Sequence, residues 1–149
     1  MNKFLQGEEV GRRYWEQLLI KNKVTDYQFE KDEYSAWDCT YIWNNITFLV
    51  EIKVRNCSST EYPDFILETD KCNNILNECL QNNYRGLYVN FFNDGIVVIW
   101  DLNKVKDTPD TTKGCKRTTA VNTGYKKKMV KLITLNQAIK VGKYNINNN

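Results

Sequence analysis

The most restrictive feature of the sequence is a pair of strand-like stretches separated by only two residues. Residues 36–43 and 46–55 are rich in β-branched and aromatic side chains, and Asn44 and Asn45 lie between them. Asparagine tolerates the left-handed backbone conformation that a two-residue hairpin turn requires. We therefore predict a tight hairpin in which Trp43 pairs with Ile46 and the remaining residues pair in step.

Alternation along this hairpin separates an apolar face from a polar one. The apolar face comprises Trp37, Cys39, Tyr41, Trp43, Ile46, Phe48, Val50, Ile52 and Val54, and we expect the core there. The other face carries Asp38, Glu51, Lys53 and Arg55 toward the end away from the turn. In this register Asp38 lies opposite Glu51. Two facing carboxylates repel each other, and a divalent cation would turn that repulsion into ligation.

A second unusual carboxylate lies in the N-terminal segment. Residues 3–22 place their apolar side chains on one stripe, which predicts an amphipathic helix. Glu8 lies in the middle of that stripe, whereas Glu9 projects to the side. A core-facing carboxylate is costly unless it is paired or bound to a metal. Glu8 is therefore a candidate site residue.

The rest of the chain predicts one mixed α/β domain over residues 1–149. Expected strands or extended segments are 24–30, 62–67, 87–92, 96–100 and 129–135, and expected helices are 72–80, punctuated by Gly86, and 136–141. Residues after Asp101 read mainly as loop, with a hairpin near 122–124. The order places a core at about 3–101 and a basic, β-rich C-terminal extension at about 102–144.

Composition excludes several classes of protein. The chain has no histidine, which removes Ser-His and Cys-His hydrolases and His-ligated zinc sites. Its five cysteines form no C-x-x-C pair, so neither a disulfide framework nor a zinc site is indicated. The apolar runs fall well short of the roughly 20 residues that cross a bilayer, and no signal peptide is recognisable. We expect an intracellular, cytoplasmic protein that does not enter a membrane.

Charge is distributed unevenly along the chain. Residues 1–100 contain 10 Lys and Arg against 15 Asp and Glu, whereas residues 101–149 contain 11 against 3. The last third is thus strongly basic although the net charge is only +3. A basic surface of this kind suits a polyanion, and a solvated lysine face is the alternative.

The pattern resembles the PD-(D/E)XK nuclease superfamily. It consists of Asp38 within Trp37-Asp38-Cys39, the strand Val50-Glu51-Ile52-Lys53 and the upstream helix with Glu8, although no proline precedes Asp38. The resemblance implies a restriction-endonuclease-like αβββαβ core with a mixed central sheet. It also implies that Asp38, Glu51 and Lys53 are catalytic, and that Glu8, Asp38, Glu51 and the Ile52 carbonyl bind Mg²⁺ or Mn²⁺.

Further basic residues are candidates for contact with nucleic acid. Arg55 continues the face of Lys53, and Lys71 begins the second helix, where similar nucleases often place a polar residue near the site. Lys126, Lys127 and Lys128 form a basic run that could neutralise backbone phosphates. Glu68 could be a further acid, although acids at helix N-termini are favourable in any case.

The resemblance implies a metal-dependent DNA endonuclease that hydrolyses phosphodiester bonds. The small size favours a structure-selective or weakly sequence-specific enzyme, and junction-resolving nucleases of this superfamily are similar in size and work as homodimers. RNA stays open as a substrate. The many Asn and Lys residues suggest an A·T-rich genome, such as that of a phage or another element in a bacterial cell.

Two other classes of function remain open at this point. One is a catalytically inactive nuclease-fold protein that binds DNA as an accessory factor. The other is a protein-interaction domain in which Asp38, Glu51 and Lys53 form a structural salt-bridge cluster.

Overall fold

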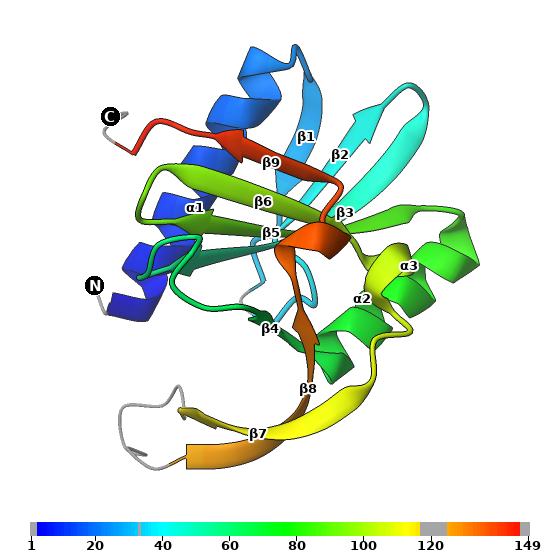
Figure 1. Ribbon diagram of the computed structural model, residues 1–149. Coiled ribbons are helices and arrows are strands. Elements are labelled where there is room, and N and C mark those ends of the chain that lie inside the picture. The colour runs from blue at the N-terminus through cyan, green and yellow to red at the C-terminus, as the bar shows by residue number, and fades with distance from the viewer. Residues whose placement is uncertain (1–2, 33, 117–124, 147–149) are drawn as a thin grey trace.

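The computed structural model describes residues 3–32, 34–116 and 125–146 (Figure 1). Its helices are α1 (Lys3–Lys21), α2 (Thr69–Asn82) and α3 (Leu102–Val105), with a 3-10 turn η1 (Leu135–Gln137). Its strands are β1 (Asp26–Phe29), β2 (Cys39–Trp43), β3 (Ile46–Arg55), β4 (Phe65–Glu68), β5 (Arg85–Phe92), β6 (Ile96–Asp101), β7 (Asp110–Lys116), β8 (Tyr125–Ile133) and β9 (Lys140–Lys143). The expected mixed α/β class is confirmed.

Two sheets organise the chain. The central sheet has the order β1-β2-β3-β5-β6-β9, and the smaller one has the order β4-β8-β7. Only the β3–β5 pair of the central sheet is parallel, with Glu51 beside Tyr88 and Lys53 beside Asn90. The central sheet is therefore mixed, as expected, and α2 lies in the connection between its two parallel strands.

The predicted hairpin forms with the predicted register. Trp43 pairs with Ile46 and Cys39 pairs with Val50. Asn44 and Asn45 both have positive φ, at 53° and 64°, which is the conformation that a type I′ turn requires. The local turn chemistry thus determines which residues of β3 face β2.

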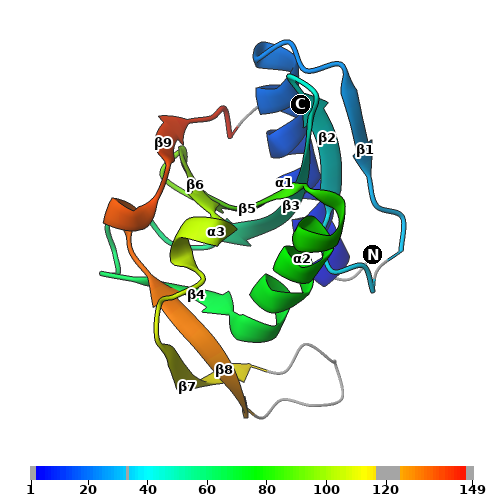
Figure 2. The ribbon, with the colours of Figure 1, turned by 90° about the vertical axis from the view of Figure 1, so that its right-hand side faces the viewer.

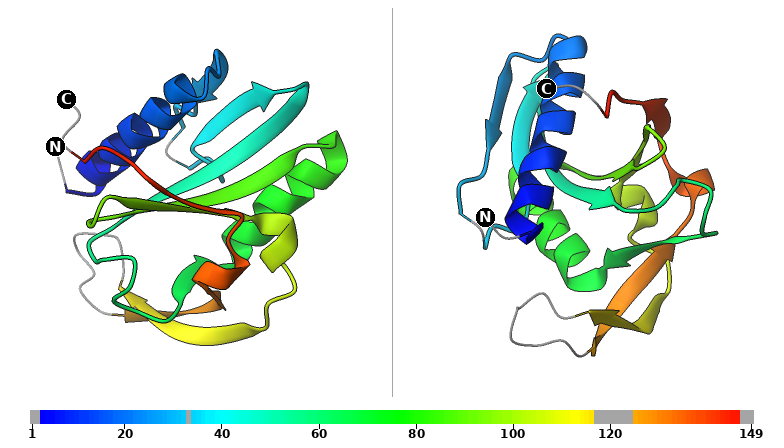
Figure 3. Two further views of the ribbon diagram at one scale, coloured as in Figure 1. Left: turned by 45° about the horizontal axis from the view of Figure 1, so that its top comes forward. Right: turned by 90° about the vertical axis from the view of Figure 1, so that its left-hand side faces the viewer.

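Both faces of the central sheet are covered, which corrects the expectation of a core on one face only. Trp15 and Leu19 of α1 pack on Val50 and Ile52. On the other face Leu49 packs in a second cluster, which also includes residues of α2, α3 and the smaller sheet. Figures 2 and 3 show α1 on one side of the sheet and α2, α3, β7 and β8 on the other. The polar face of the hairpin is therefore interior.

Several segments differ from prediction. β2 begins at Cys39 rather than at residue 36, because the Asp38 side chain takes over the contact with β3 at this end. Residues 110–116, expected as loop, pair with β8. In place of the helix expected at 136–141, the chain forms the 3-10 turn η1 and then the edge strand β9. Pairing with a neighbouring strand outweighs weak local preferences in both cases. The hairpin expected near 122–124 lies outside the described residues.

The second helix ends earlier than Gly86. Its C-cap is Asn83, which has the left-handed backbone conformation that ends many helices. Gly86 instead lies within β5, where an added Cβ would come 2.9 Å from Cγ2 of Ile75. This glycine allows α2 to approach the sheet closely.

Within the described residues, no helix is both long enough and apolar enough to cross a membrane.

Candidate functional site

Asp38 connects β2 to β3 through its side chain. Its backbone N–H donates to the carbonyl of Val50 at 2.8 Å, although Val50 is already the register partner of Cys39. Its Oδ2 atom accepts a 2.7 Å hydrogen bond from the backbone N–H of Ile52. The carboxylate thus replaces a backbone carbonyl as acceptor, and β2 ends its regular pairing here. The backbone does not hold Asp38 directly opposite Glu51 as predicted, but the two carboxyl groups still meet.

Glu51 is the most deeply buried acid of the site, with 5% of its surface exposed. Burial, an interaction with the carboxyl group of Asp38 and the charge of that residue together raise its pKa from 4.5 to about 8. Lys71 and Lys53 act the other way. A buried acid beside a second acid favours a bound cation or a bound proton.

Lys71 supplies one positive charge. It lies in the first turn of α2, and its Nζ atom is 3.1 Å from Oε2 of Glu51. Among the described atoms, that same buried oxygen has no well-aligned hydrogen-bond donor. The contact is thus an ion pair that leaves the hydrogen-bonding capacity of Oε2 unused. The charge of Glu51 keeps the pKa of Lys71 above its ordinary value, although burial opposes this.

Lys53 supplies the second ammonium group. Burial lowers its pKa, the nearby charge of Lys71 lowers it further, and Glu51 and Glu68 partly offset both effects. An amine whose pKa is lowered loses its proton more readily and can then accept one from water. The side chain is therefore suited to proton transfer.

Glu68 extends the cluster toward the smaller sheet. It is the N-cap residue of α2, and its Oε1 atom accepts a 2.9 Å hydrogen bond from Nζ of Lys128 in β8. Burial alone would raise the pKa of Glu68, but Lys128, Lys71 and Lys53 together lower it. Sequence reasoning assigned Glu68 mainly to the helix terminus. The structure places it within the charge network of the site.

Arg12 is a residue that sequence reasoning missed. It extends from α1 to place Nη2 3.7 Å from Oδ1 of Asp38, while Nη1 donates to the Glu30 carbonyl at 2.6 Å. Its guanidinium also lies 5.6 Å from the centre of the Phe29 ring. Arg12 follows Glu8 by four residues, so both lie on one helix face. This four-residue spacing from Glu8 is the sequence feature that could have identified Arg12 as a site residue.

Glu8 and Ile52 remain predictions as metal ligands. Glu8 is half-buried, one helical turn before Arg12. No three or more His, Cys, Asp and Glu side chains of the described residues lie close enough together to hold a metal ion. The structure therefore does not bring Glu8 into a three-acid group with Asp38 and Glu51. Ile52 lies between Glu51 and Lys53, beneath Gly11 of α1.

Arg55 is half-buried and makes three hydrogen bonds within the chain, and its contact with phosphate stays a prediction. Its Nε atom donates to Oδ1 of Asn90 at 2.7 Å. Its Nη2 atom donates to the Ile66 carbonyl at 2.9 Å and to the Tyr88 hydroxyl at 2.7 Å. Asn90 and Tyr88 are buried on β5. The guanidinium thus joins β3, β5 and β4 inside the protein.

Of the three lysines in the basic run, the structure describes the side chain of Lys128 alone. Lys126 and Lys127 hold positions in β8 opposite Cys115 and Gly114, and their side chains lie outside the description. The Lys128 side chain is half-buried against Glu68.

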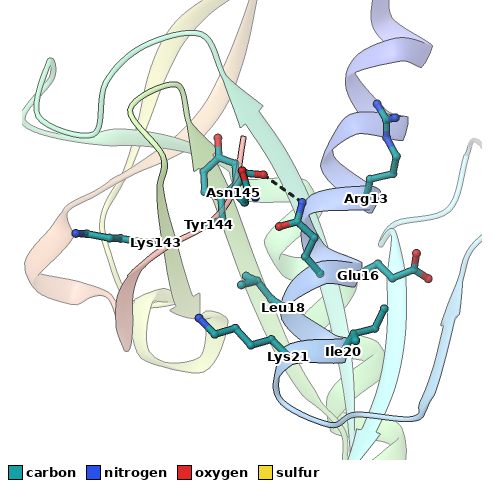
Figure 4. A pocket seen from close by; sticks show the side chains of 9 residues that line it. Arg13, Glu16, Leu18, Ile20, Lys21, Lys143, Tyr144 and Asn145 are labelled. Carbon is teal, nitrogen blue, oxygen red and sulfur yellow. Dashed lines mark hydrogen bonds between the residues drawn. The ribbon is translucent and has the colours of Figure 1, made fainter. Parts of the chain in front are cut away.

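A large pocket of the described residues lies elsewhere. It has a volume of about 850 Å³ and lies between α1 and the segment 143–145, where Gln17 donates to the carbonyl of Asn145 (Figure 4). Its one acidic lining residue is Glu16, which accepts a hydrogen bond from the Tyr27 hydroxyl. None of the predicted site residues lines it. We therefore locate the candidate site at the charged cluster and not at this pocket.

The donor set of the cluster fits a magnesium-like cation. Mg²⁺ typically binds one or two carboxylates and retains water or substrate phosphate as its other ligands, so two acids suffice. Glu51 Oε2 is buried and lacks an aligned donor among the described residues, and burial and the adjacent Asp38 raise the pKa of Glu51. Asp38 and Glu51 would hold the ion.

Comparison with known proteins bears on the fold. The sequence matches no family model and no curated protein. The fold is similar to that of Hjc from Archaeoglobus fulgidus, a Holliday junction resolvase from an archaeal hyperthermophile. The TM-score is 0.50 at 10% sequence identity, and the match covers 81% of this chain and 83% of that chain. The chain thus shares a fold with a junction-resolving nuclease.

Proposed function

We propose that the chain is a metal-dependent DNA endonuclease with a restriction-endonuclease-like core, which hydrolyses phosphodiester bonds and selects its substrate by structure or by weak sequence preference. The observation that supports this most strongly is the meeting of Asp38 and Glu51 beside Lys53. The buried carboxyl group of Glu51 has its pKa raised by burial and by the neighbouring Asp38, and it lies near an amine whose pKa is lowered.

The roles follow from the chemistry of each group. A bound Mg²⁺ or Mn²⁺ would lower the pKa of an attacking water and offset the charge of the phosphorane. Asp38 and Glu51 would hold that ion, and the Ile52 carbonyl would be a further ligand. Lys53 orients the water and accepts its proton. Lys71 lies near enough to Glu51 to contact the phosphate and to reduce its negative charge.

The substrate class rests on the fold. Similarity to a Holliday junction resolvase makes branched DNA the first substrate to test, and the basic C-terminal third suits a polyanion. A homodimer would bring two such sites to one junction. RNA is the competing substrate.

A second candidate is a nuclease-fold protein that binds DNA without cutting it. The ion pairs of Asp38 with Arg12 and of Glu51 with Lys71 favour this candidate, because each acid already has a cationic neighbour from the chain itself. In that case Asp38 and Glu51 stabilise the folded protein through these ion pairs, and binding of DNA requires no metal.

Cleavage assays separate the two candidates. Labelled four-way junctions, linear duplex and supercoiled plasmid are incubated with Mg²⁺ or Mn²⁺, beside EDTA and the variant Glu51→Gln. Cutting that is lost in both controls supports the enzyme, and a preference for junctions identifies the substrate. A folded protein that binds DNA but cuts none of these substrates contradicts the catalytic proposal.

A further inference from the structure

The hairpin formed by β7 and β8 extends beyond the strands that anchor it. β4 pairs only with residues 130–133 of β8, whereas the β7–β8 pairing continues outward to Lys116 and Tyr125. Figure 1 and the left view of Figure 3 show this hairpin leading away from the central sheet. The outer five pairs, Thr112–Lys116 with Tyr125–Met129, form a two-stranded ribbon, which we call the β7–β8 ribbon.

The composition of the β7–β8 ribbon is unusual. Of its ten residues, five are lysines and none is acidic; the lysines are Lys113, Lys116, Lys126, Lys127 and Lys128. The register sets Lys113 directly opposite Lys128. Like charges at facing positions weaken a strand pair. An anionic partner would offset that cost, as Glu68 does for Lys128.

The dimensions of a ribbon suit one kind of polyanion. The major groove of B-form DNA, about 12 Å wide, admits a two-stranded β-ribbon. Five pairs extend about 17 Å at the usual rise per residue, which is roughly half a turn of the duplex. Lysines on both strands of such a ribbon would supply positive charge along the groove.

The β7–β8 ribbon is also tied to the candidate site. Lys128 is bonded to Glu68 at 2.9 Å, and Glu68 precedes Lys71 by three residues at the start of α2. A duplex that lies along the ribbon would therefore run past the acids at the base of the ribbon. The ion pair fixes where the ribbon begins relative to Glu51.

We propose that the β7–β8 ribbon is a duplex-binding arm that enters the major groove of B-form DNA beside the candidate site. The proposal builds on the proposed function, but it concerns binding alone and is testable without metal. It assigns Lys126 and Lys127 to contact with duplex phosphates.

Anisotropy of a labelled duplex in EDTA, measured over a range of salt concentrations, tests the arm. The variant K126A/K127A should bind about 10- to 100-fold more weakly at moderate salt, and the slope of log K against log salt should fall by about 2. The matched control K104A/K106A removes two exposed lysines at α3 and should leave the slope unchanged. For a single strand of the same sequence the variant should lose less affinity than for the duplex. Unchanged duplex binding, or equal losses on both substrates, would overturn the proposal.

A second measurement needs no variant. Reductive methylation of lysines in the wild-type protein, read by peptide mass spectrometry, should show Lys126 and Lys127 protected by duplex while Lys104 and Lys106 remain reactive. Unprotected Lys126 and Lys127 in the bound complex would contradict the arm. A protein that binds by this arm but cuts no DNA would refute the nuclease and leave the arm intact. Metal-dependent cutting by the wild type, together with normal duplex binding by K126A/K127A, would support the nuclease and refute the arm.

Discussion

The carboxylate of Asp38 accepts a 2.7 Å hydrogen bond from the backbone N–H of Ile52, the residue between Glu51 and Lys53. One acid thus holds the strand that carries the other acid and the amine. Because this bond replaces a backbone contact at the end of β2, Asp38 has a structural role as well as its proposed metal-binding role.

Substitutions of Asp38 should separate these two roles. Asp38→Ala leaves the Ile52 N–H without its acceptor and should lower the free energy of unfolding by about 1–3 kcal/mol. Asp38→Asn retains an acceptor oxygen for the Ile52 N–H but loses the charge that faces Arg12, so in EDTA it should lower the free energy of unfolding by less than Asp38→Ala does. Both should lose metal-dependent cutting, because the amide is a poor ligand for Mg²⁺. Urea unfolding and cleavage rates measure the two effects. Full activity of Asp38→Asn would contradict the metal-binding role.

Glu51 should make the metal-free protein less stable as the pH rises. Its pKa in the folded protein is raised from 4.5 to about 8, so the folded state holds a proton that the unfolded chain releases between these values. Proton release therefore favours unfolding, and the free energy of unfolding should fall across this pH range. Urea unfolding in EDTA at a series of pH values measures it.

The variant Glu51→Gln carries no titrating group and should flatten this part of the profile. The exposed Glu61 provides the matched control Glu61→Gln, which should keep the wild-type slope. A wild-type profile that rises over the same range would show that Glu51 is ionised in the folded protein.

The hairpin that carries the acids was predictable because its determinants are local. Asn44 and Asn45 adopt the backbone conformation for which their side chains are suited, and the turn then sets the register. The covering of the second face was not predictable in this way. Leu49 stands among polar neighbours in the sequence pattern but is only 1% exposed, because α2 and α3 pack over it.

Long-range contacts account for the parts of the site that sequence reasoning missed. Arg12 reaches Asp38 only because α1 crosses the sheet at β3. The contacts of Arg55 with Asn90 and Tyr88 depend on the parallel pairing of β3 with β5, which no local pattern reveals. A strand-end arginine looks the same in sequence whether it meets solvent or three internal acceptors.

Lys71 should affect the rate of cutting more than it affects stability. Lys71→Ala removes the cation 3.1 Å from Glu51, and because the lysine side chain is 39% exposed the free energy of unfolding should fall by only about 1 kcal/mol. The cutting rate should fall about 100-fold if the ammonium stabilises charge on the phosphate. Lys71→Arg keeps the charge and should recover part of the rate.

Metal affinity gives an independent measurement on the same variant. Removing an ammonium group from beside Glu51 should leave Mn²⁺ binding, followed by calorimetry, as tight as in the wild type or tighter. A variant that cuts at the wild-type rate would show that Lys71 only pairs with Glu51.

Arg55 should contribute to stability and not to binding of DNA. Arg55→Ala removes the donor shared by the Ile66 carbonyl and the Tyr88 hydroxyl, and it leaves the Oδ1 atom of the fully buried Asn90 without its partner. Loss of these contacts should lower the free energy of unfolding by about 2–4 kcal/mol. Arg55→Lys keeps the charge but cannot bridge all the acceptors, so it should lie between wild type and alanine. The slope of log K against log salt for duplex binding should stay at the wild-type value in both variants. If Arg55 instead contacts a phosphate, the slope for Arg55→Ala will fall by about 1 while stability changes little.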